Sequence, residues 1–252
     1  MDAKANGNTW PQPPEDLALA SHEVHLWRCR VDLPDDGLAR CHDLLNPAEK
    51  QQAARFLAPA DCNRFTVARA SLRLILASYL GCAPKEISFV LGAHGKPSLS
   101  APGGSPPLEF NISHSGSLAL VCVAASGRPV GVDVEWTGRD MATMDLARRI
   151  LSPAEFGTFM QAPPARRNHL FLSIWTVKEA VVKALGRGIS LPLSSFTVTF
   201  PVGRPLVVEG GADSSGISDL TVMPLEPDRD HLGAVAAAGS SWSLRCWSAT
   251  GI

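Results

Sequence analysis

The chain has 252 residues and a formal net charge of −1 at pH 7, which suits one large domain or two small ones. This charge provides no whole-molecule attraction to nucleic acid or to anionic membranes, and no apolar run reaches membrane-spanning length. The six cysteines are scattered without C-x-x-C pairs or zinc spacing, which indicates reduced thiols. The N-terminus lacks the apolar core of a signal peptide. We therefore expect a cytoplasmic protein with no nucleic-acid or membrane partner.

The first half of the sequence alternates strand and helix signals. Residues 1–21 are polar and rich in Asn, Pro and Gly, which predicts a flexible N-terminal arm. A first α+β lobe is expected over residues 22–128, beginning with a strand over residues 24–33. Asn46-Pro47-Ala48-Glu49 is a capping box for a short helix. A long helix over residues 61–80 and strands over residues 87–90, 109–113, 118–124 and 130–136 are expected to follow.

The second half repeats this order. Ser152-Pro153-Ala154-Glu155 restates the capping box 106 residues after Asn46. A second long helix over residues 166–185 ends at Gly186, as the first ends at Gly81. Strand patterns in the tail, ending with residues 242–248, are expected to complete a second lobe over residues 129–252. The matching spacing indicates duplication, and we predict an α+β fold with two similar lobes, a pseudo-dimer in which each small antiparallel sheet packs with a long helix.

Two carboxylates share one side of a predicted strand. In the run Val130–Trp136, Asp133 and Glu135 are two residues apart and so point the same way. Carboxylates that close make each other harder to ionise unless a cation lies between them, and Mg²⁺ prefers such oxygen ligands. Charged residues are mostly exposed, so this pair by itself is more typical of a solvated edge strand.

Glu179 and Lys183 lie four residues apart on the second long helix and share a face. An ordinary surface ion pair explains that spacing. The rest of the helix is largely apolar, from Trp175 to Leu185, which favours a position at a boundary between lobes. At such a boundary the carboxylate can bind a metal while the ammonium binds a phosphate.

Two further segments carry groups suited to phosphate oxygens. Gly95 and Pro97 flank Lys96, which predicts a tight turn with an exposed ammonium. Ser113 and His114 end a predicted strand in a hydroxyl and an imidazole. A turn histidine bonded to backbone is the alternative for His114. A serine hydrolase is disfavoured because neighbouring strand residues point apart and no G-x-S-x-G elbow is present.

The segments G-K-P, F-N-I-S-H-S, G-V-D-V-E and W-T-V-K-E-A-x-x-K-A-x-G-x-G, in this order, resemble the Sfp-type 4′-phosphopantetheinyl transferases over residues 45 to 200. The resemblance implies a site at the junction of two lobes, coenzyme A as co-substrate, Mg²⁺ as cofactor and an apo acyl or peptidyl carrier protein as acceptor. By position, the resemblance implies that Asp133, Glu135 and Glu179 are metal ligands and that Lys183 lies near the reacting phosphate. It also implies that coenzyme A is bound at Lys96, Ser113, His114 and Arg69.

The expected reaction moves 4′-phosphopantetheine to a carrier serine and releases adenosine 3′,5′-bisphosphate. Lys183 stabilises the leaving group, and Glu179 is the candidate base. The pathway served, fatty acid, polyketide or nonribosomal peptide synthesis, stays open. Two other functions are kept as alternatives: a Mg²⁺-dependent phosphohydrolase of nucleotides or coenzyme A, and a non-catalytic carrier-protein binding module. Trp27 and Cys29 stand where the repeat has Asp133 and Glu135, so we expect a monomer with one coenzyme site.

Overall fold

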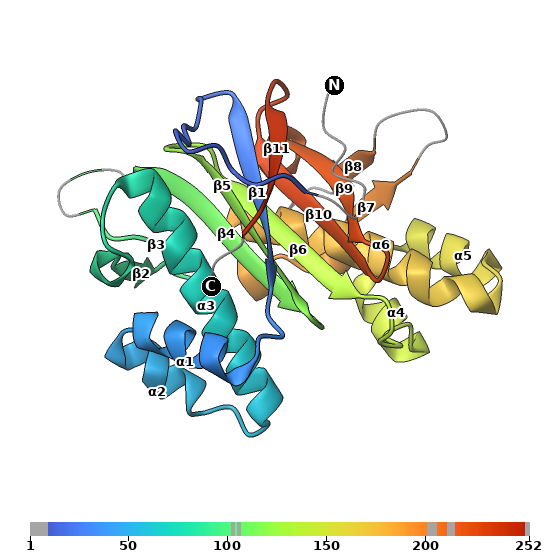
Figure 1. Cartoon of the computed structure of the whole chain (residues 1–252). Helices are drawn as coiled ribbons and strands as arrows, with labels where there is room; N and C mark the ends of the chain where they lie inside the picture. The colour runs from blue at the N-terminus through green and yellow to red at the C-terminus, as the bar shows by residue number, and fades with distance from the viewer. Residues whose placement is uncertain (1–9, 102–103, 105–106, 201–205, 211–214, 250–252) are drawn as a thin grey trace.

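The structure is a computed structural model that describes residues 10–101, 104, 107–200, 206–210 and 215–249. As predicted, it is an α+β fold, with helices on both flanks of a central group of strands (Figure 1). The first half forms β1 (Glu23–Arg30), α1 (Asp35–Leu44), α2 (Pro47–Ala53), α3 (Pro59–Leu80), β2 (Phe89–Leu91), β3 (Pro97–Leu99), β4 (Leu108–Ser115) and β5 (Leu118–Ala125). The second half forms β6 (Val130–Trp136), α4 (Met144–Ile150), α5 (Pro153–Gln161), α6 (Pro164–Leu185), β7 (Phe196–Thr199), β8 (Val207–Gly210), β9 (Leu220–Asp228), β10 (His231–Ala238) and β11 (Ser243–Ser248).

The two halves share their order of elements and their strand register. In each half the first strand pairs antiparallel with the last strand of a hairpin. Trp27 on β1 faces Val121 on β5, and Asp133 on β6 faces Ala234 on β10. Helices α3 and α6 both contain 22 residues and end at a glycine with positive φ. Trp27 and Asp133 therefore occupy corresponding positions, and the predicted pair of similar lobes is confirmed, while the predicted lobe boundary at residue 128 stays a prediction.

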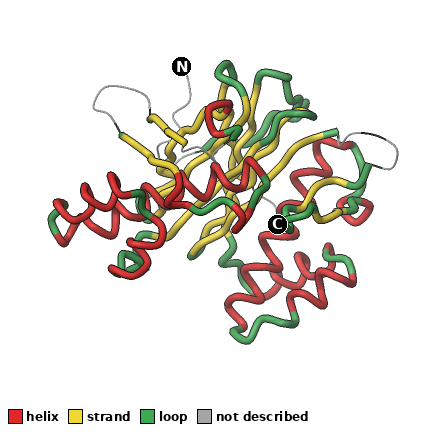
Figure 2. The backbone as a smooth tube through the Cα atoms, turned by 180° about the vertical axis from the view of Figure 1, so that it is seen from behind, coloured by secondary structure: helices red, strands yellow, loops and turns green. Residues whose placement is uncertain are grey.

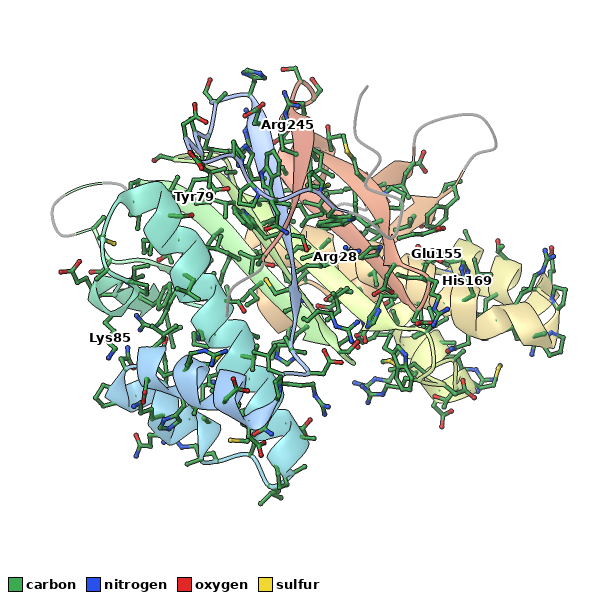
Figure 3. All side chains as sticks on the ribbon, viewed as in Figure 1. Arg28, Tyr79, Lys85, Glu155, His169 and Arg245 are labelled. Carbon is green, nitrogen blue, oxygen red and sulfur yellow. The ribbon has the colours of Figure 1, made fainter. Side chains whose placement is uncertain are left out.

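Each half also buries one ion pair at the same place. The capping-box glutamate of the short helix meets a cation of the long helix: Glu49 accepts a hydrogen bond from Arg73 Nε at 2.8 Å, and Glu155 lies 2.8 Å from Lys178 Nζ. Figure 3 labels Glu155 on the flank formed by α4 and α5. Both cations are fully buried, and a buried charge requires a partner. The pairs therefore hold α2 on α3 and α5 on α6.

The described residues form three apolar cores. One lies between α3 and the sheet ordered β11-β1-β5-β4, and a second lies between α6 and the sheet ordered β6-β10-β9. The third joins strands of both halves and includes Val24, Leu120, Val132 and Val235. Figure 2 shows these strands running through the centre of the molecule, with the long helices against them. The two halves thus share the third core.

Trp10 holds the N-terminal segment at one point, whereas residues 1–9 lie outside the described residues, and the flexible arm expected over residues 1–21 stays a prediction. Trp10 is only 5% exposed and belongs to the core that joins the halves. The guanidinium of Arg28 lies over the Trp10 ring, and Pro11 O accepts a hydrogen bond from Ser248 N. The single large apolar side chain of Trp10 anchors this polar segment. The average composition of the segment does not reveal such an anchor.

The last strand also departs from expectation. β11 pairs in parallel with β1, with Glu23 opposite Ser243, so the tail does not end within the second lobe. Without β11 the outer edge of β1 would expose unpaired N–H and C=O groups, and covering that edge satisfies them. The first sheet is consequently mixed. No helix in the described part of the chain is both long and apolar enough to cross a membrane.

Candidate functional site

A cavity of about 600 Å³ lies at the junction of the two halves, beside α6. The first half contributes the loop between β2 and β3 and part of β4. The second half contributes α4, α6 and the segment that follows α6. The lining residues that bear on the chemistry are Lys96, Asn111, Arg149, Trp175, Glu179 and Lys183. Residues from both halves are therefore needed to form it.

Strands β4 and β6 belong to different sheets, and side chains of β4 join them. Asn111 Oδ1 accepts a hydrogen bond from Val132 N at 3.0 Å. Two residues on, Ser113 Oγ donates to Asp133 Oδ1 at 2.7 Å. Alternate β4 residues point the same way, so Asn111 and Ser113 both face β6. Their hydrogen bonds hold β4 against the strand that bears the acids. The F-N-I-S-H-S segment thus positions the carboxylates of G-V-D-V-E.

A glycine allows α6 to lie directly on β6. A Cβ built on Gly131 would stand 2.9 Å from the carbonyl carbon of Lys183 and closer still to Ala180 O and Ala184 N. No real Cβ tolerates such contacts, so this backbone approach requires glycine. Because Glu179 and Lys183 flank the contact on α6, the close approach brings their side chains to the acidic strand.

Lys183 and Asp133 form the central ion pair of the site. Lys183 Nζ donates to Asp133 Oδ1 at 2.6 Å and to Ser113 Oγ at 3.0 Å. Asp133 is only 3% exposed. Its second oxygen, Oδ2, is buried and has no hydrogen-bond partner among the described residues. Buried acceptors of this kind are rare in folded proteins, so the unpaired Oδ2 requires an explanation.

The two other acids interact with Asp133. Burial raises the pKa of Glu135, and the charge of Asp133 raises it further. Burial likewise raises the pKa of Glu179, with contributions from Asp133 and Glu135 that Lys183 opposes. Three carboxylates thus share one region. Within the described ranges, however, no three His, Cys, Asp or Glu side chains are gathered into a group that could hold a metal as they stand.

Lys96 is not the exposed ammonium that its turn predicts. Its Nζ donates to Val130 O at 2.9 Å and to Ala184 O at 3.4 Å. Burial lowers its pKa. The side chain therefore ties the loop after β2 to the start of β6 and the end of α6. An ammonium has three N–H groups, so a third remains for a ligand in the cavity that Lys96 lines.

His114 and Arg69 lie apart from the cavity lining. His114 is exposed near the end of β4, yet the surrounding protein and the positive charges of Lys183 and Arg64 lower its pKa. Arg69 Nε lies 3.6 Å from Glu49 Oε1, and its guanidinium is over the rings of Phe65 and Phe89. The structure thus brings together six of the predicted residues, namely Lys96, Ser113, Asp133, Glu135, Glu179 and Lys183. Arg69 has structural partners instead, and its predicted role stays a prediction.

Two family models match the chain: one described as the 4′-phosphopantetheinyl transferase superfamily over residues 129–248, and one described as 4′-phosphopantetheinyl transferase, N-terminal, over residues 34–127. The 4′-phosphopantetheinyl transferase HetI of Nostoc sp. is 34% identical over 240 residues, which cover 95% of this chain and 98% of the relative. The chain belongs to the 4′-phosphopantetheinyl transferase superfamily.

Other members of the superfamily match shorter segments. The 4′-phosphopantetheinyl transferase Sfp of Bacillus subtilis is 28% identical over 159 residues, covering 63% of this chain and 68% of the relative. The holo-[acyl-carrier-protein] synthase structure of Thermotoga maritima covers 44% of this chain and 63% of its own, with 24% identity and a TM-score of 0.38. That structural likeness is too low to carry an argument. The resemblance to the Sfp type is confirmed by the sequence relatives.

Proposed function

We propose that this phosphopantetheinyl transferase moves the 4′-phosphopantetheine group of coenzyme A to a serine of an apo acyl or peptidyl carrier protein. The observation that carries the proposal is the meeting of Asp133, Glu179 and Lys183, from two elements, beside a cavity that Lys96 enters from the other half. Coenzyme A carries a pyrophosphate and a 3′-phosphate, and these oxygens require cationic and hydrogen-bonding partners. The site provides two ammonium groups for them.

The acids suit a hard divalent cation. Asp133 Oδ2 is a buried acceptor that has no partner among the described residues, and burial together with neighbouring carboxylates raises the pKa values of Glu135 and Glu179. Oxygen ligands of this kind are those that Mg²⁺ prefers. We assign Asp133, Glu135 and Glu179 as its ligands, and Mg²⁺ when bound would neutralise charge on the phosphate oxygens.

The residues of the chain can supply the remaining chemistry. The carrier serine Oγ attacks the β-phosphorus of coenzyme A, the new O–P bond forms, and the bond to the bridging oxygen breaks. Adenosine 3′,5′-bisphosphate leaves with the electron pair, next to the ammonium of Lys183. Glu179 lines the cavity and is the candidate base for the serine proton.

Only one half of the chain can hold this site, which supports a monomer with one coenzyme per chain. In the first half the counterpart of Asp133 is Trp27, whose Nε1 donates to Tyr79 Oη at 2.9 Å. The counterpart of Glu135 is Cys29, which is fully buried. A cytoplasmic location is proposed as well, supported by six free cysteines and the absence of any disulfide among the described residues.

Intact-mass spectrometry tests the function. The protein is mixed with coenzyme A, Mg²⁺ and several apo carriers, and each carrier is expected to gain one phosphopantetheine per active serine. A matched reaction without carrier measures coenzyme A turnover. Carriers of unchanged mass, together with consumption of coenzyme A in the carrier-free reaction, would point to the phosphohydrolase and contradict the transferase. Unchanged carriers and unchanged coenzyme A would favour a binding module.

A further inference from the structure

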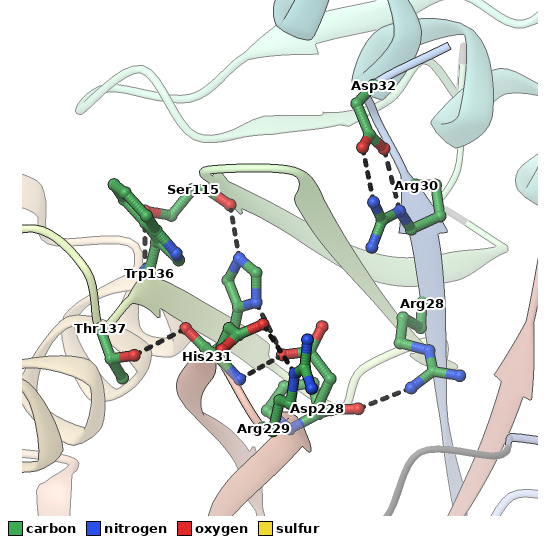
Figure 4. A network of polar contacts seen from close by, with 11 residues as sticks. Arg28, Arg30, Asp32, Ser115, Trp136, Thr137, Asp228, Arg229 and His231 are labelled. Atoms are coloured by element: carbon green, nitrogen blue, oxygen red, sulfur yellow. Dashed lines mark hydrogen bonds and ion pairs between the residues drawn. The ribbon is translucent and has the colours of Figure 1, made fainter.

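The turn between β9 and β10 contacts the end of β4 through a buried histidine. His231 is 2% exposed. Its Nδ1 lies 2.8 Å from Asp228 Oδ1, and its Nε2 lies 3.1 Å from Ser115 O, as Figure 4 shows. Carboxylate and carbonyl oxygens only accept hydrogen bonds, so the ring nitrogen that carries the proton donates to the oxygen that it faces. His231 therefore spans from the second half to the last residue of β4.

Ser115 in turn contacts β6, the strand that bears the acids. Its Oγ donates to Glu135 Oε2 at 2.7 Å and accepts a hydrogen bond from Trp136 N at 3.1 Å. A hydroxyl has one hydrogen. Because Trp136 N–H is already a donor, the Ser115 hydrogen points at Glu135 and holds one carboxylate oxygen.

This corner of the molecule leaves little room for adjustment. Gly116 follows Ser115 with φ +57°, and a Cβ there would stand 3.0 Å from Trp136 Cβ and 3.1 Å from His231 Nε2. The Asp228 carboxylate is held by its contact with His231 Nδ1 and by a hydrogen bond from Asp230 N. Burial by itself raises its pKa, but hydrogen bonds from His231 and from the Asp230 N–H outweigh burial, so the pKa lies below its usual value.

We propose that His231, held by Asp228, is a positioning residue that fixes Ser115 and, through it, the Glu135 carboxylate. The inference rests on the proposed function, in which Glu135 is a ligand of Mg²⁺. The repeat supports it, because Leu118 occupies the matching place in the first half: it pairs with Arg30 as His231 pairs with Trp136. The histidine is thus present only beside the strand that bears the acids.

The test compares two buried histidines. His231→Leu removes the contact to Ser115. His25→Leu is the matched control, because His25 is 1% exposed and contacts Glu23 and Tyr79 in the first half, away from the acids. Binding of Mn²⁺ alone to the full chain is measured by electron paramagnetic resonance of the free ion, together with thermal unfolding. Residues that orient ligands contribute about tenfold or more to metal affinity, so the Mn²⁺ Kd should rise about tenfold in His231→Leu and stay unchanged in His25→Leu.

A double-mutant cycle shows whether His231 acts through Ser115. Ser115→Ala is expected to weaken Mn²⁺ binding, and adding His231→Leu to it should weaken binding no further. Asp228→Asn, which keeps the shape and loses the charge, provides the same comparison should His231→Leu fail to fold. Wild-type Mn²⁺ affinity in a folded His231→Leu or Asp228→Asn protein would overturn the inference, as would a wild-type chain that binds no Mn²⁺. Carrier modification by the wild type is measured separately. A failure of the proposed function can then be distinguished from a failure of the inference about His231.

Discussion

Gly131 of β6 lies directly beneath Ala184 of α6, with backbone against backbone. In the first half the matching positions hold His25 and Tyr79, whose side chains are hydrogen-bonded at 2.7 Å and fill the space between strand and helix. One lobe therefore has a close strand-to-helix contact that brings Glu179 and Lys183 to the acids. The other has an aromatic cluster at the same place.

Gly131→Ala should destabilise the protein and reduce transfer. The new Cβ would collide with the α6 backbone, and overpacking of a rigid contact costs about 1–3 kcal/mol or more. Thermal unfolding measures the loss. The matched control is Gly157→Ala on α5, an exposed site where a Cβ meets nothing within 4 Å and where alanine should stabilise by about 0.5–1 kcal/mol. Equal stability of the two variants would contradict the close contact.

Asp133→Asn and Glu179→Ala should each reduce transfer while the chain remains folded. Both remove a carboxylate assigned to Mg²⁺, and in Asp133→Asn the ammonium of Lys183 loses its charged partner at 2.6 Å. Losing one electrostatic group at a reacting centre costs about 10²-fold or more in rate. Intact-mass kinetics on a carrier check this, with circular dichroism as the folding control. Transfer at the wild-type rate at ordinary Mg²⁺ would exclude the metal assignment.

Lys96→Ala and His114→Ala should raise the KM for coenzyme A more than they lower kcat. Each is assigned to phosphate that does not react, so it contributes mainly uniform binding. Lys96→Ala should also lower stability by about 1–3 kcal/mol, because Val130 O and Ala184 O lose their donor. His114 is exposed, so its substitution should leave stability unchanged. A collapse of kcat with an unchanged KM would instead assign His114 to the chemical step.

Glu179→Gln should be more stable than wild type at neutral pH. Burial raises the pKa of Glu179 above its ordinary value of 4.5 in the folded protein, so between that value and the raised one the folded state binds more protons than the unfolded state. The stability that Glu179 contributes therefore falls as the pH rises through this window. The gain in Tm from Glu179→Gln should shrink toward zero below pH 4.5, measured in EDTA. Exposed Glu15→Gln is the control, and a gain independent of pH would contradict the prediction.

The chain should bind one coenzyme A as a monomer. Trp27 and Cys29 are buried where the second half has its acids, so the matching place in the first half offers no carboxylate for a second metal. Titration calorimetry with coenzyme A and Mg²⁺, on protein sized by light scattering, measures the stoichiometry. Two equivalent sites per chain, or activity found only in a dimer, would show that the first half carries a site of its own.

Local signals predicted the elements that depend on local chemistry. The capping boxes at Asn46 and Ser152 are formed as predicted, and both long helices end at the expected glycines. Helix α1 was not predicted, since Pro34 precedes it without a side-chain cap. The ion pairs of the capping glutamates were not predicted either, because a capping box fixes the backbone of a helix end and not the other partners of the carboxylate. Arg73 and Lys178 each contact the same Oε2 atom that accepts the capping hydrogen bond.

By itself the sequence determined the repeat, the acidic pair on one strand and the shared face of Glu179 and Lys183, because strand alternation and helical spacing depend only on residues near in the chain. Only the tertiary structure decided what these groups meet. Ser113 and Ser115 reach the acids because β4 lies beside β6 without pairing with it, and His231 reaches Ser115 from a turn 116 residues away. Contacts between such distant segments follow from how two sheets pack, and packing is set by the whole apolar interior rather than by any local pattern.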